Sequence, residues 1–556
     1  MKLISALIVG FLLAGSLGIA AYGANSRSMP HLQQQGTAIQ LIVEGKPFLI
    51  LAGELGNSTG EPEFLRPYWP KLASLHLNTL LVPIYWDVLE PEEGKFDFTT
   101  VDALLADARE HKMRLVLLWF GSWKNSMSCY VPAWVKRDTT RFPRSHDSRG
   151  LSLEILSPFH IANLEADARA FTAFMRHLRE IDGEQHTVLM VQVENEIGMI
   201  PEARDHNPEA EKQFAGPAPM ELMDYLAKNV EMLAPELRVL WLGAGGKRAG
   251  TWSEVFGTET GGEEIFMAWN FARYVQQITT RGKAEYSLPM FVNAALIRPG
   301  HQPGQYPSAG PLPHLLDVWR AGAPAIDLLA PDIYFQNFTE WTRRYARNGN
   351  PLFIPEALAG PEAALNGIFA FASHNAIGFS PFGIETISES AGRAIADGFD
   401  MVTQLTPLIT EHQGLGTMVG LLSEGVEQRQ PQRVALGDYV MFVSFERPIP
   451  PAVAEGLAAP GGSGGSGGAT QSSGGLVIQV EPDEFILSGT GITATFQTRG
   501  LGPVQAGILS VEEGRFVDGK WTHIRWLNGD QTNQGRHVSI EPSHFGIRRV
   551  RLYKYK

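Results

Sequence analysis

The chain has few of the features that mark several common protein classes. Cys129 is the only cysteine among 556 residues, so there is no intrachain disulfide and no cysteine cluster for zinc. The histidines lack HExxH-type spacing, and no Ser-His-Asp nucleophile elbow is recognisable. The formal net charge of −13 argues against nucleic acid and anionic membranes as partners, because both attract a basic surface. These absences predict a protein without metal or other cofactor, and they favour a neutral substrate.

Long apolar runs are also scarce, and the one exception lies at the N-terminus. Lys2 precedes an apolar run over residues 3–13, and small residues follow it. This pattern predicts a secretory signal peptide over residues 1–23, with cleavage near Ala24. A membrane anchor is the alternative, although glycines and Ser16 interrupt the run. We therefore expect export to the periplasm or the medium, no membrane contact after cleavage, and no lipid, since no cysteine follows the signal. Nothing indicates the oligomeric state.

The length of the chain indicates a large catalytic domain with a smaller appendage. From residue 47 onward, short apolar runs alternate with helical patterns, as in repeated βα units of a parallel sheet. The eight runs cover residues 47–54, 78–86, 114–123, 188–196, 289–294, 327–334, 351–356 and 376–382. They predict an α/β fold, a (β/α)8 TIM barrel over residues 24–415. Alternating patterns then predict an all-β domain over residues 416–556, with a Gly/Ser-rich loop or linker at 461–475.

Two parts of this assignment have alternatives. The fifth strand is the least certain, because residues 238–242 and 265–270 also resemble strands. A doubly wound sheet is the competing fold, but it normally carries a glycine-rich phosphate loop after its first strand. Residues 51–60, LAGELGNSTG, do not have that pattern, so the barrel is favoured.

Carboxylates stand at the ends of two predicted strands. The run VLMVQVENEIG, residues 188–198, is apolar until it reaches Asn195 and Glu196, and PLFIPEA ends in Glu356. In TIM barrels the carboxyl ends of the strands meet at one mouth, where the reacting groups lie. Glycoside hydrolysis needs such a pair of carboxyls, one to protonate the leaving oxygen and one to attack the sugar or activate water. A structural salt-bridge cluster is the alternative for either residue taken alone.

These residues resemble a known family. Asn-Glu at the end of strand four and Glu at the end of strand seven are similar to the clan of retaining TIM-barrel glycosidases. Within it, IYWDVLEPEEGKFDF (residues 84–98) and VQVENEIG resemble β-galactosidases of glycoside hydrolase family 35, in the bacterial branch with an appended β domain. The resemblance covers roughly residues 45–385. It implies that Glu196 is the acid/base, that Glu356 is the nucleophile, and that Asn195 contacts the sugar 2-hydroxyl.

Glu194 needs a separate explanation. Strict strand alternation puts Glu194 and Glu196 on one face and Asn195 on the other, although Asn195 and Glu196 must both reach the sugar. A bulge or twist at the end of the strand would reconcile these demands. We therefore interpret Glu194 as a buried supporting partner rather than a catalytic group.

Further residues near the strand ends are weaker candidates for substrate binding. Similar enzymes place a tyrosine at the position of Tyr334, where it bonds the nucleophile. Other candidates are Glu54, Tyr85, Trp123, Lys124 and Asn125. Packing or surface exposure is the alternative for each. In the stretch FGSWKN, the animal members of the family have an acidic residue at the position of Ser122. Lys124 or Asn125 would have to bind the sugar hydroxyl that this acidic residue normally holds.

The sequence thus predicts a retaining exo-β-galactosidase that removes terminal non-reducing β-D-galactose from oligosaccharides, for example from plant cell-wall xyloglucan side chains. The same machinery with another glycone, a β-glucoside or an α-L-arabinoside, is the first alternative. The second is a non-catalytic carbohydrate-binding protein, which would be expected to have lost one of the two carboxylates.

Overall fold

The structure is a computed structural model that describes residues 29–347, 349–424, 431–445, 473–500, 502–542 and 544–556. The predicted signal peptide, residues 1–23, lies outside these ranges, as does most of the Gly/Ser-rich tract at 461–475. No helix within the described ranges is long and apolar enough to cross a membrane.

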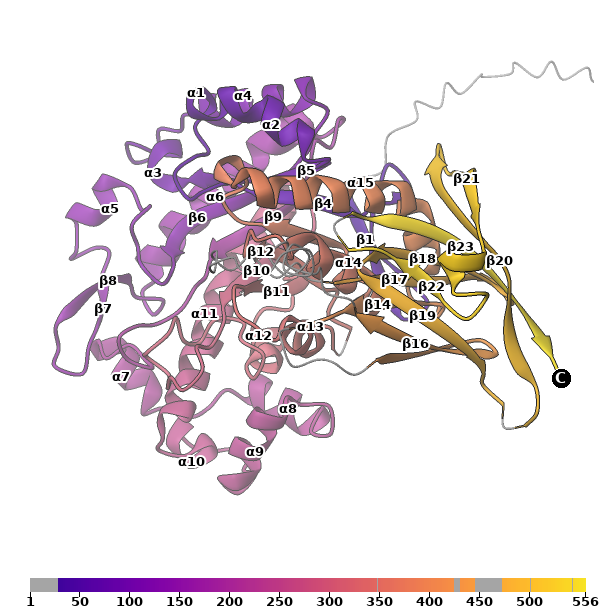
Figure 1. Cartoon of the computed structure of the whole chain (residues 1–556). Helices are drawn as coiled ribbons and strands as arrows, with labels where there is room; N and C mark the ends of the chain where they lie inside the picture. The colour runs from indigo at the N-terminus through magenta and orange to yellow at the C-terminus, as the bar shows by residue number, and fades with distance from the viewer. Residues whose placement is uncertain (1–28, 348, 425–430, 446–472, 501, 543) are drawn as a thin grey trace, which may run out of the picture.

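A closed barrel of eight parallel strands forms the larger part of the molecule (Figure 1). Around the barrel its strands are β4 (Ile50–Glu54), β5 (Thr79–Tyr85), β6 (Arg114–Lys124), β9 (Val188–Asn195), β10 (Met290–Ala295), β11 (Leu328–Ile333), β12 (Phe353–Ala357) and β13 (Gly378–Pro381). Each strand overlaps one of the eight predicted runs, which confirms the predicted TIM barrel. The runs are apolar throughout because barrel strands are buried on both faces, by the interior on one side and by helices on the other.

Helices surround the barrel, and a long excursion separates β9 from β10. The helices are α1 (Pro62–Leu65), α2 (Trp69–Ser74), α3 (Trp86–Leu89), α4 (Thr99–Glu110), α5 (Ala133–Arg137), α6 (Ile161–Asp182), α7 (Pro208–Phe214), α8 (Met220–Lys228), α9 (Pro235–Gly243), α10 (Trp252–Phe256), α11 (Thr260–Glu285), α12 (Leu316–Gly322), α13 (Phe338–Tyr345), α14 (Ala363–His374) and α15 (Glu389–His412). Residues 238–242 lie in α9 and residues 265–270 in α11. The fifth strand is therefore β10, and the strand-like alternatives were wrong.

One end of the barrel is closed by a feature that the sequence analysis missed. The strands β1 (His31–Gln35), β2 (Ala38–Val43) and β3 (Lys46–Pro47) form a small antiparallel sheet. Leu41 and Val43 of β2 join the apolar cluster inside the barrel, beside Ile50, Phe291 and Phe353. Ile50 and Phe353 begin their strands, so this sheet covers the N-terminal end and leaves the opposite mouth for chemistry.

The C-terminal part is an all-β domain of two packed sheets. One sheet has the order β14-β17-β18-β23-β20-β21 and the other β15-β16-β19-β22. The strands are β14 (Met418–Leu422), β15 (Gln432–Leu436), β16 (Tyr439–Phe445), β17 (Gly474–Glu481), β18 (Glu484–Thr490), β19 (Ile492–Thr498), β20 (Gln505–Val517), β21 (Lys520–Leu527), β22 (Val538–Ile540) and β23 (Gly546–Tyr555). Figure 1 shows this domain beside the barrel, and α14 lies against β14 and β17. The described chain thus has the predicted architecture, a TIM barrel followed by β structure.

Candidate active site

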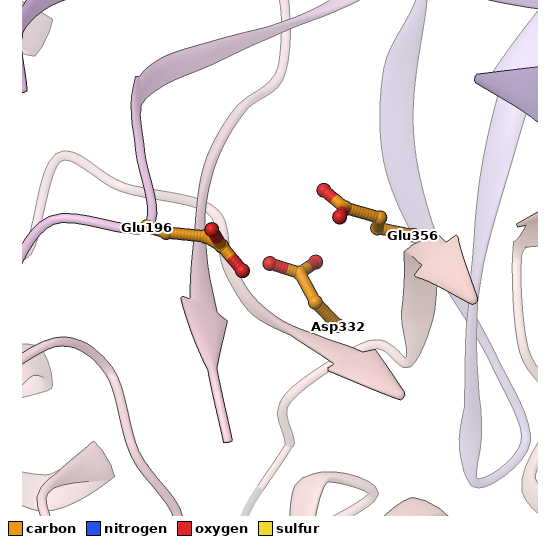
Figure 2. Close-up of side chains that lie close together, drawn as sticks. All are labelled: Glu196, Asp332 and Glu356. Carbon is orange, nitrogen blue, oxygen red and sulfur yellow. The ribbon is translucent and has the colours of Figure 1, made fainter. Parts of the chain in front are cut away.

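Three carboxylates meet at the C-terminal mouth of the barrel. Glu196 follows β9, Asp332 lies on β11 and Glu356 lies on β12; each offers an oxygen, and these three oxygens lie within 4.8 Å of one another. Figure 2 shows Glu196 and Glu356 pointing toward each other, with Asp332 between them. All three side chains are at least 96% buried. The structure therefore brings the two predicted catalytic residues together, and it adds a carboxylate that was not predicted.

Tyr334 lies beside one of these carboxylates. Its hydroxyl donates a hydrogen bond to Glu356 Oε1. Burial, followed by the charge of Glu196, raises the pKa of Glu356 to about 7, against the opposite effects of Lys124 and the Tyr334 hydrogen bond. The structure thus places Tyr334 where the resemblance implied, in contact with the residue expected to be the nucleophile. Because a hydroxyl donor stabilises a carboxylate, the bond favours the ionised form of Glu356.

Asp332 belongs to a network that also holds the backbone of Glu196. Asn293 of β10 accepts a hydrogen bond from Glu196 N at 2.9 Å and donates one to Asp332 Oδ2 at 2.7 Å. Burial, followed by the charges of Glu356 and Glu196, raises the pKa of Asp332 well above its usual value. Sequence reasoning missed Asp332 and Asn293. The available signal was strand alternation, which puts Asp332 on the same face as Tyr334, two residues later.

Several buried polar atoms in this region have no hydrogen-bond partner among the described residues. They include both amide atoms of Asn195, Oε1 of Glu54, Oε2 of Glu196 and Oε2 of Glu356. Burial and the charge of Glu356 raise the pKa of Glu54 well above its usual value, so Glu54 is part of the same electrostatic cluster. Leaving buried polar groups unpaired is costly. A polar ligand that supplies several hydroxyls would satisfy them.

Lys124 provides a positive charge within the carboxylate cluster. Its side chain is 4% exposed, and Nζ lies 3.8 Å from Glu196 Oε2 and 5.3 Å from the centre of the Phe120 ring. Its charge lowers the pKa values of Glu54, Asp332 and Glu356. Asn125 comes next in the chain; its side chain is exposed, and its backbone N–H donates to Asn195 O at 3.2 Å. Both predicted residues therefore lie next to the acid cluster.

The backbone around Glu196 departs from an ordinary strand. Glu194 has a φ of 61° and Glu196 a φ of 45°, in the left-handed region that non-glycine residues seldom occupy. Each such residue costs on the order of 1–3 kcal/mol, and strain of this kind is typical of functional sites. The two left-handed residues break the alternation of the strand, and Glu194 contacts Asp167 of α6, outside the barrel wall. The expected irregularity is present, and Glu194 is buried away from the cluster.

Two of the residues predicted to bind substrate have other contacts. Trp123 is fully buried, donates to Leu156 O at 3.2 Å and packs edge-on against Phe271 and Tyr274 of α11. It lies on the helix side of the barrel wall, so the prediction that it lines the sugar pocket was wrong. Between Trp119 and Lys124 the pairing of β6 with β9 is interrupted by a bulge, and Trp123 lies within it. Tyr85 is buried, its hydroxyl accepts a hydrogen bond from Gly60 N at 3.1 Å, and its ring stacks on Tyr130.

A divalent cation fits this cluster poorly. Glu196, Asp332 and Glu356 could each offer one oxygen, but Mg²⁺ and Ca²⁺ take about six to eight oxygen ligands. The ammonium of Lys124, 3.8 Å from Glu196, already supplies positive charge at this place. The donor set is better suited to binding a polyhydroxylated ligand and to moving protons.

Comparison with known proteins indicates what the barrel resembles. Residues 70–255 match a glycoside hydrolase family 42 model described as Beta-galactosidase, and residues 395–539 match a domain of unknown function (DUF5597). A β-galactosidase of Xanthomonas manihotis is 29% identical over 205 residues, which are 35% of this chain and 30% of that protein. The chain thus spans less than a third of that relative. The matched part of the barrel is similar to β-galactosidases, and the narrower assignment to family 35 stays a prediction.

Solved structures with a similar course of the chain are also β-galactosidases. The enzyme of Rahnella sp. R3 is 17% identical, with a TM-score of 0.45 over 68% of this chain and 58% of that one. The enzyme of Bacillus circulans sp. alkalophilus is 12% identical, with a TM-score of 0.45 over 65% of this chain and 57% of that one.

Proposed function

We propose that the protein is a retaining β-galactosidase that removes terminal, non-reducing β-D-galactose from oligosaccharides. The observation that carries the proposal is the pair of Glu196 and Glu356, whose oxygens approach within 4.8 Å across the mouth of a TIM barrel. Retaining glycosidases keep their two carboxyls about 5–5.5 Å apart, whereas inverting enzymes leave about 6.5–9.5 Å for a water molecule. The similarity of residues 70–255 to β-galactosidases supports the choice of glycone.

In this mechanism the two carboxyls have different protonation states. The mechanism requires Glu196 to be protonated when the leaving group departs and Glu356 to be ionised, and the hydrogen bond that Tyr334 donates to Glu356 favours the ionised form of Glu356. Glu196 then protonates the departing glycosidic oxygen while ionised Glu356 attacks the anomeric carbon. A glycosyl-enzyme ester forms, and the negative charge of Glu356 disappears. Glu196, now ionised, takes a proton from water, which attacks the anomeric carbon and releases the sugar with its configuration retained.

The remaining polar groups would hold the sugar. Asn195, with both amide atoms unpaired, is positioned to bind the 2-hydroxyl, a contact that strengthens in the transition state. Glu54 and Lys124 would bind other hydroxyls of the galactose, and Asn125 lies at the exposed edge, where the leaving group departs. Xyloglucan side chains are the natural substrate we favour, and export from the cytoplasm would bring the enzyme to them.

The nucleophile can be tested by chemical rescue. Glu356→Gly should reduce hydrolysis of an activated aryl β-galactoside by several orders of magnitude, and azide should partly restore turnover by entering the vacated space and yielding a glycosyl azide of inverted configuration. The matched control is Glu362→Gly, a glutamate six residues later that directly precedes α14. Full activity of Glu356→Gly would refute the assignment. A panel of aryl glycosides tests the glycone, and a clear preference for a glucoside or an arabinoside would refute the galactose proposal.

A further inference from the structure

A bulge on strand β6 places Lys124 at the active site. Trp119 of β6 pairs with Val193 of β9, and the next pair is Lys124 with Asn195. Residues 120–123 therefore face the single residue Glu194, and the backbone of β6 bows outward there. Beyond the bulge, Asn125 N donates to Asn195 O, and Ser126 N donates to Glu196 O at 3.1 Å. The position of Lys124 beside Glu196 thus depends on what holds the bulge.

Two buried carboxyl groups stabilise the bulge of β6. The bulge frees the N–H groups of Ser122 and Trp123 from the strand ladder. Ser122 N donates to Asp167 Oδ2 at 3.2 Å, and Trp123 N donates to Glu194 Oε2 at 2.8 Å. Asp167 belongs to α6 and Glu194 to β9, and both side chains are fully buried. The pair therefore joins the helix layer, the bulge and the strand that ends in Glu196.

The hydrogen-bond partners of the two carboxyls differ, and this difference indicates which of them can hold a proton. Asp167 only accepts: Oδ1 bonds Trp119 Nε1 at 3.0 Å, and Oδ2 bonds Ser122 Oγ at 2.5 Å and Tyr274 Oη at 3.5 Å. Oε1 of Glu194 receives no N–H or O–H bond from the described residues. The two carboxyls are close neighbours, because Ser122 N and Trp123 N, which are adjacent in the chain, donate to Asp167 Oδ2 and to Glu194 Oε2 respectively. Two adjacent buried carboxylates repel each other, and one shared proton removes that repulsion; Glu194 Oε1, which accepts no N–H or O–H bond, is the atom that can carry the proton.

Neighbouring residues pack closely around the pair. A Cβ on Gly121 would lie 2.8 Å from Glu194 Oε1 and 2.3 Å from Trp119 Nε1, so this position requires glycine. The side chains that bond the pair are Trp119 and Ser122 of β6 and Tyr274 of α11, and within the described ranges no basic side chain is among them. Burial raises the pKa values of both carboxyls, and the charge of Asp167 raises that of Glu194 further.

We propose that Glu194 and Asp167 form a proton-sharing acid pair, with the proton on Glu194, and that this pair positions Lys124 and Glu196 for catalysis. Neither residue touches the substrate; both act through the bulge of β6. The proposal rests on the proposed function only for its effect on turnover, because the protonation of the pair is a property of the resting protein. Loss of the shared proton at high pH would leave two adjacent buried anions and release the bulge.

The proposal predicts an asymmetry between two conservative substitutions. In Glu194→Gln the amide oxygen can accept from Trp123 N while the NH₂ group donates to Asp167, so the variant mimics the protonated glutamate. We expect kcat/KM at pH 6 within about threefold of the unchanged protein. In Asp167→Asn the NH₂ group must face either Trp119 Nε1 or Ser122. Both of these donate hydrogen bonds to Asp167, so the NH₂ group would be opposite another donor and at least one hydrogen bond would be lost. We expect a loss in kcat of about ten- to a hundredfold, because a small displacement of catalytic groups has effects of this size.

The matched control is Glu165→Gln, two residues from Asp167 on α6, where the glutamate bonds Arg281 on the surface. It should leave kcat unchanged. The alkaline limb of the pH profile provides a second kinetic readout, since Glu194→Gln cannot lose its neutral form and should retain activity to higher pH. Equal losses in Glu194→Gln and Asp167→Asn, or a larger loss in Glu194→Gln, would overturn the proposal.

An infrared measurement tests the pair even if the enzyme hydrolyses another glycoside or if Asp167→Asn does not fold. The C=O stretching band of a protonated carboxyl, recorded in D₂O at pH 8, should lose intensity in Glu194→Gln and remain unchanged in Glu165→Gln. An unchanged band in folded Glu194→Gln would show that Glu194 is ionised and would refute the shared proton. If this difference is seen while no β-galactoside is hydrolysed, the pair stands and the proposed function fails.

Discussion

Replacing Tyr334 by phenylalanine removes one hydrogen bond from the expected nucleophile and leaves the shape of the side chain nearly unchanged. The tyrosine hydroxyl donates to Glu356 Oε1 inside a buried cluster. A hydrogen bond to a charged group contributes about 1.5–3 kcal/mol, and a change of about 1.4 kcal/mol moves a pKa by one pH unit. Tyr334→Phe should therefore raise the pKa of Glu356 by about one to two pH units.

The pH profile of kcat/KM reports this change. The pKa of Glu356 is raised to about 7, so the acid limb of the unchanged protein should lie near pH 7. Since attack requires the ionised form, a higher pKa moves the limb to higher pH. At pH 6, Tyr334→Phe should reduce kcat/KM by about ten- to a hundredfold, because the ionised fraction falls tenfold for each pH unit of displacement.

A second tyrosine serves as a control for the loss of a buried hydroxyl. Tyr286 follows α11, and its hydroxyl lies 3.1 Å from His186 Nδ1, just before β9 begins and thus at the opposite end of the barrel. Tyr286→Phe should leave the acid limb in place. If folded Tyr334→Phe has the same acid limb as the unchanged protein, Tyr334 does not control the ionisation of Glu356 and the reasoning is refuted.

Two further predictions concern the same cluster. Because the folded-state pKa of Glu356 is raised from 4.5 to about 7, the associated stability is present below pH 4.5 and is lost as the pH rises through 7. At pH 8, ionisation of buried Glu356 thus lowers the free energy of unfolding by about 3 kcal/mol. Glu356→Gln should therefore unfold at a higher temperature than the unchanged protein at pH 8 but not at pH 4. Equal unfolding temperatures at pH 8 would contradict this prediction. Lys124→Met removes the positive charge that lowers the pKa of Glu356. The acid limb of the kcat/KM profile of this variant should therefore move to higher pH. An acid limb that stays in place would show that the ammonium of Lys124 does not act on the nucleophile.

Much of the barrel could be predicted because buried parallel strands carry a strong local signal. Runs such as residues 188–196 are apolar on both faces, and their spacing leaves room for at least one helix between most neighbouring strands. The regions 238–242 and 265–270 were ambiguous because short apolar runs occur in strands and in buried helices alike. For residues 265–270 the decision comes from the packing of α11 against α6 and α12. The small sheet β1–β3 was missed because its two- to six-residue strands carry little periodicity.

The candidate site was predictable where a residue ends a strand. Glu196 and Glu356 were found in this way, because the barrel brings the carboxyl ends of its strands to one mouth whatever the loops do. Asp332 was missed although alternation puts it on the face of Tyr334. Trp123 was misplaced because its direction depends on the bulge between Trp119 and Lys124, and the sequence does not show that four residues of β6 face one residue of β9.

The sequence alone thus determined the strands, their order and the two carboxylates at their ends, since these follow from local hydrophobic patterns and from the geometry of parallel barrels. The tertiary structure alone decided the direction of each side chain around Glu196. Glu194 and Glu196 adopt left-handed backbone conformations, which local sequence does not favour. Contacts with Asp167, Asn293 and the β6 bulge hold these conformations, and those contacts join residues that are distant in the chain.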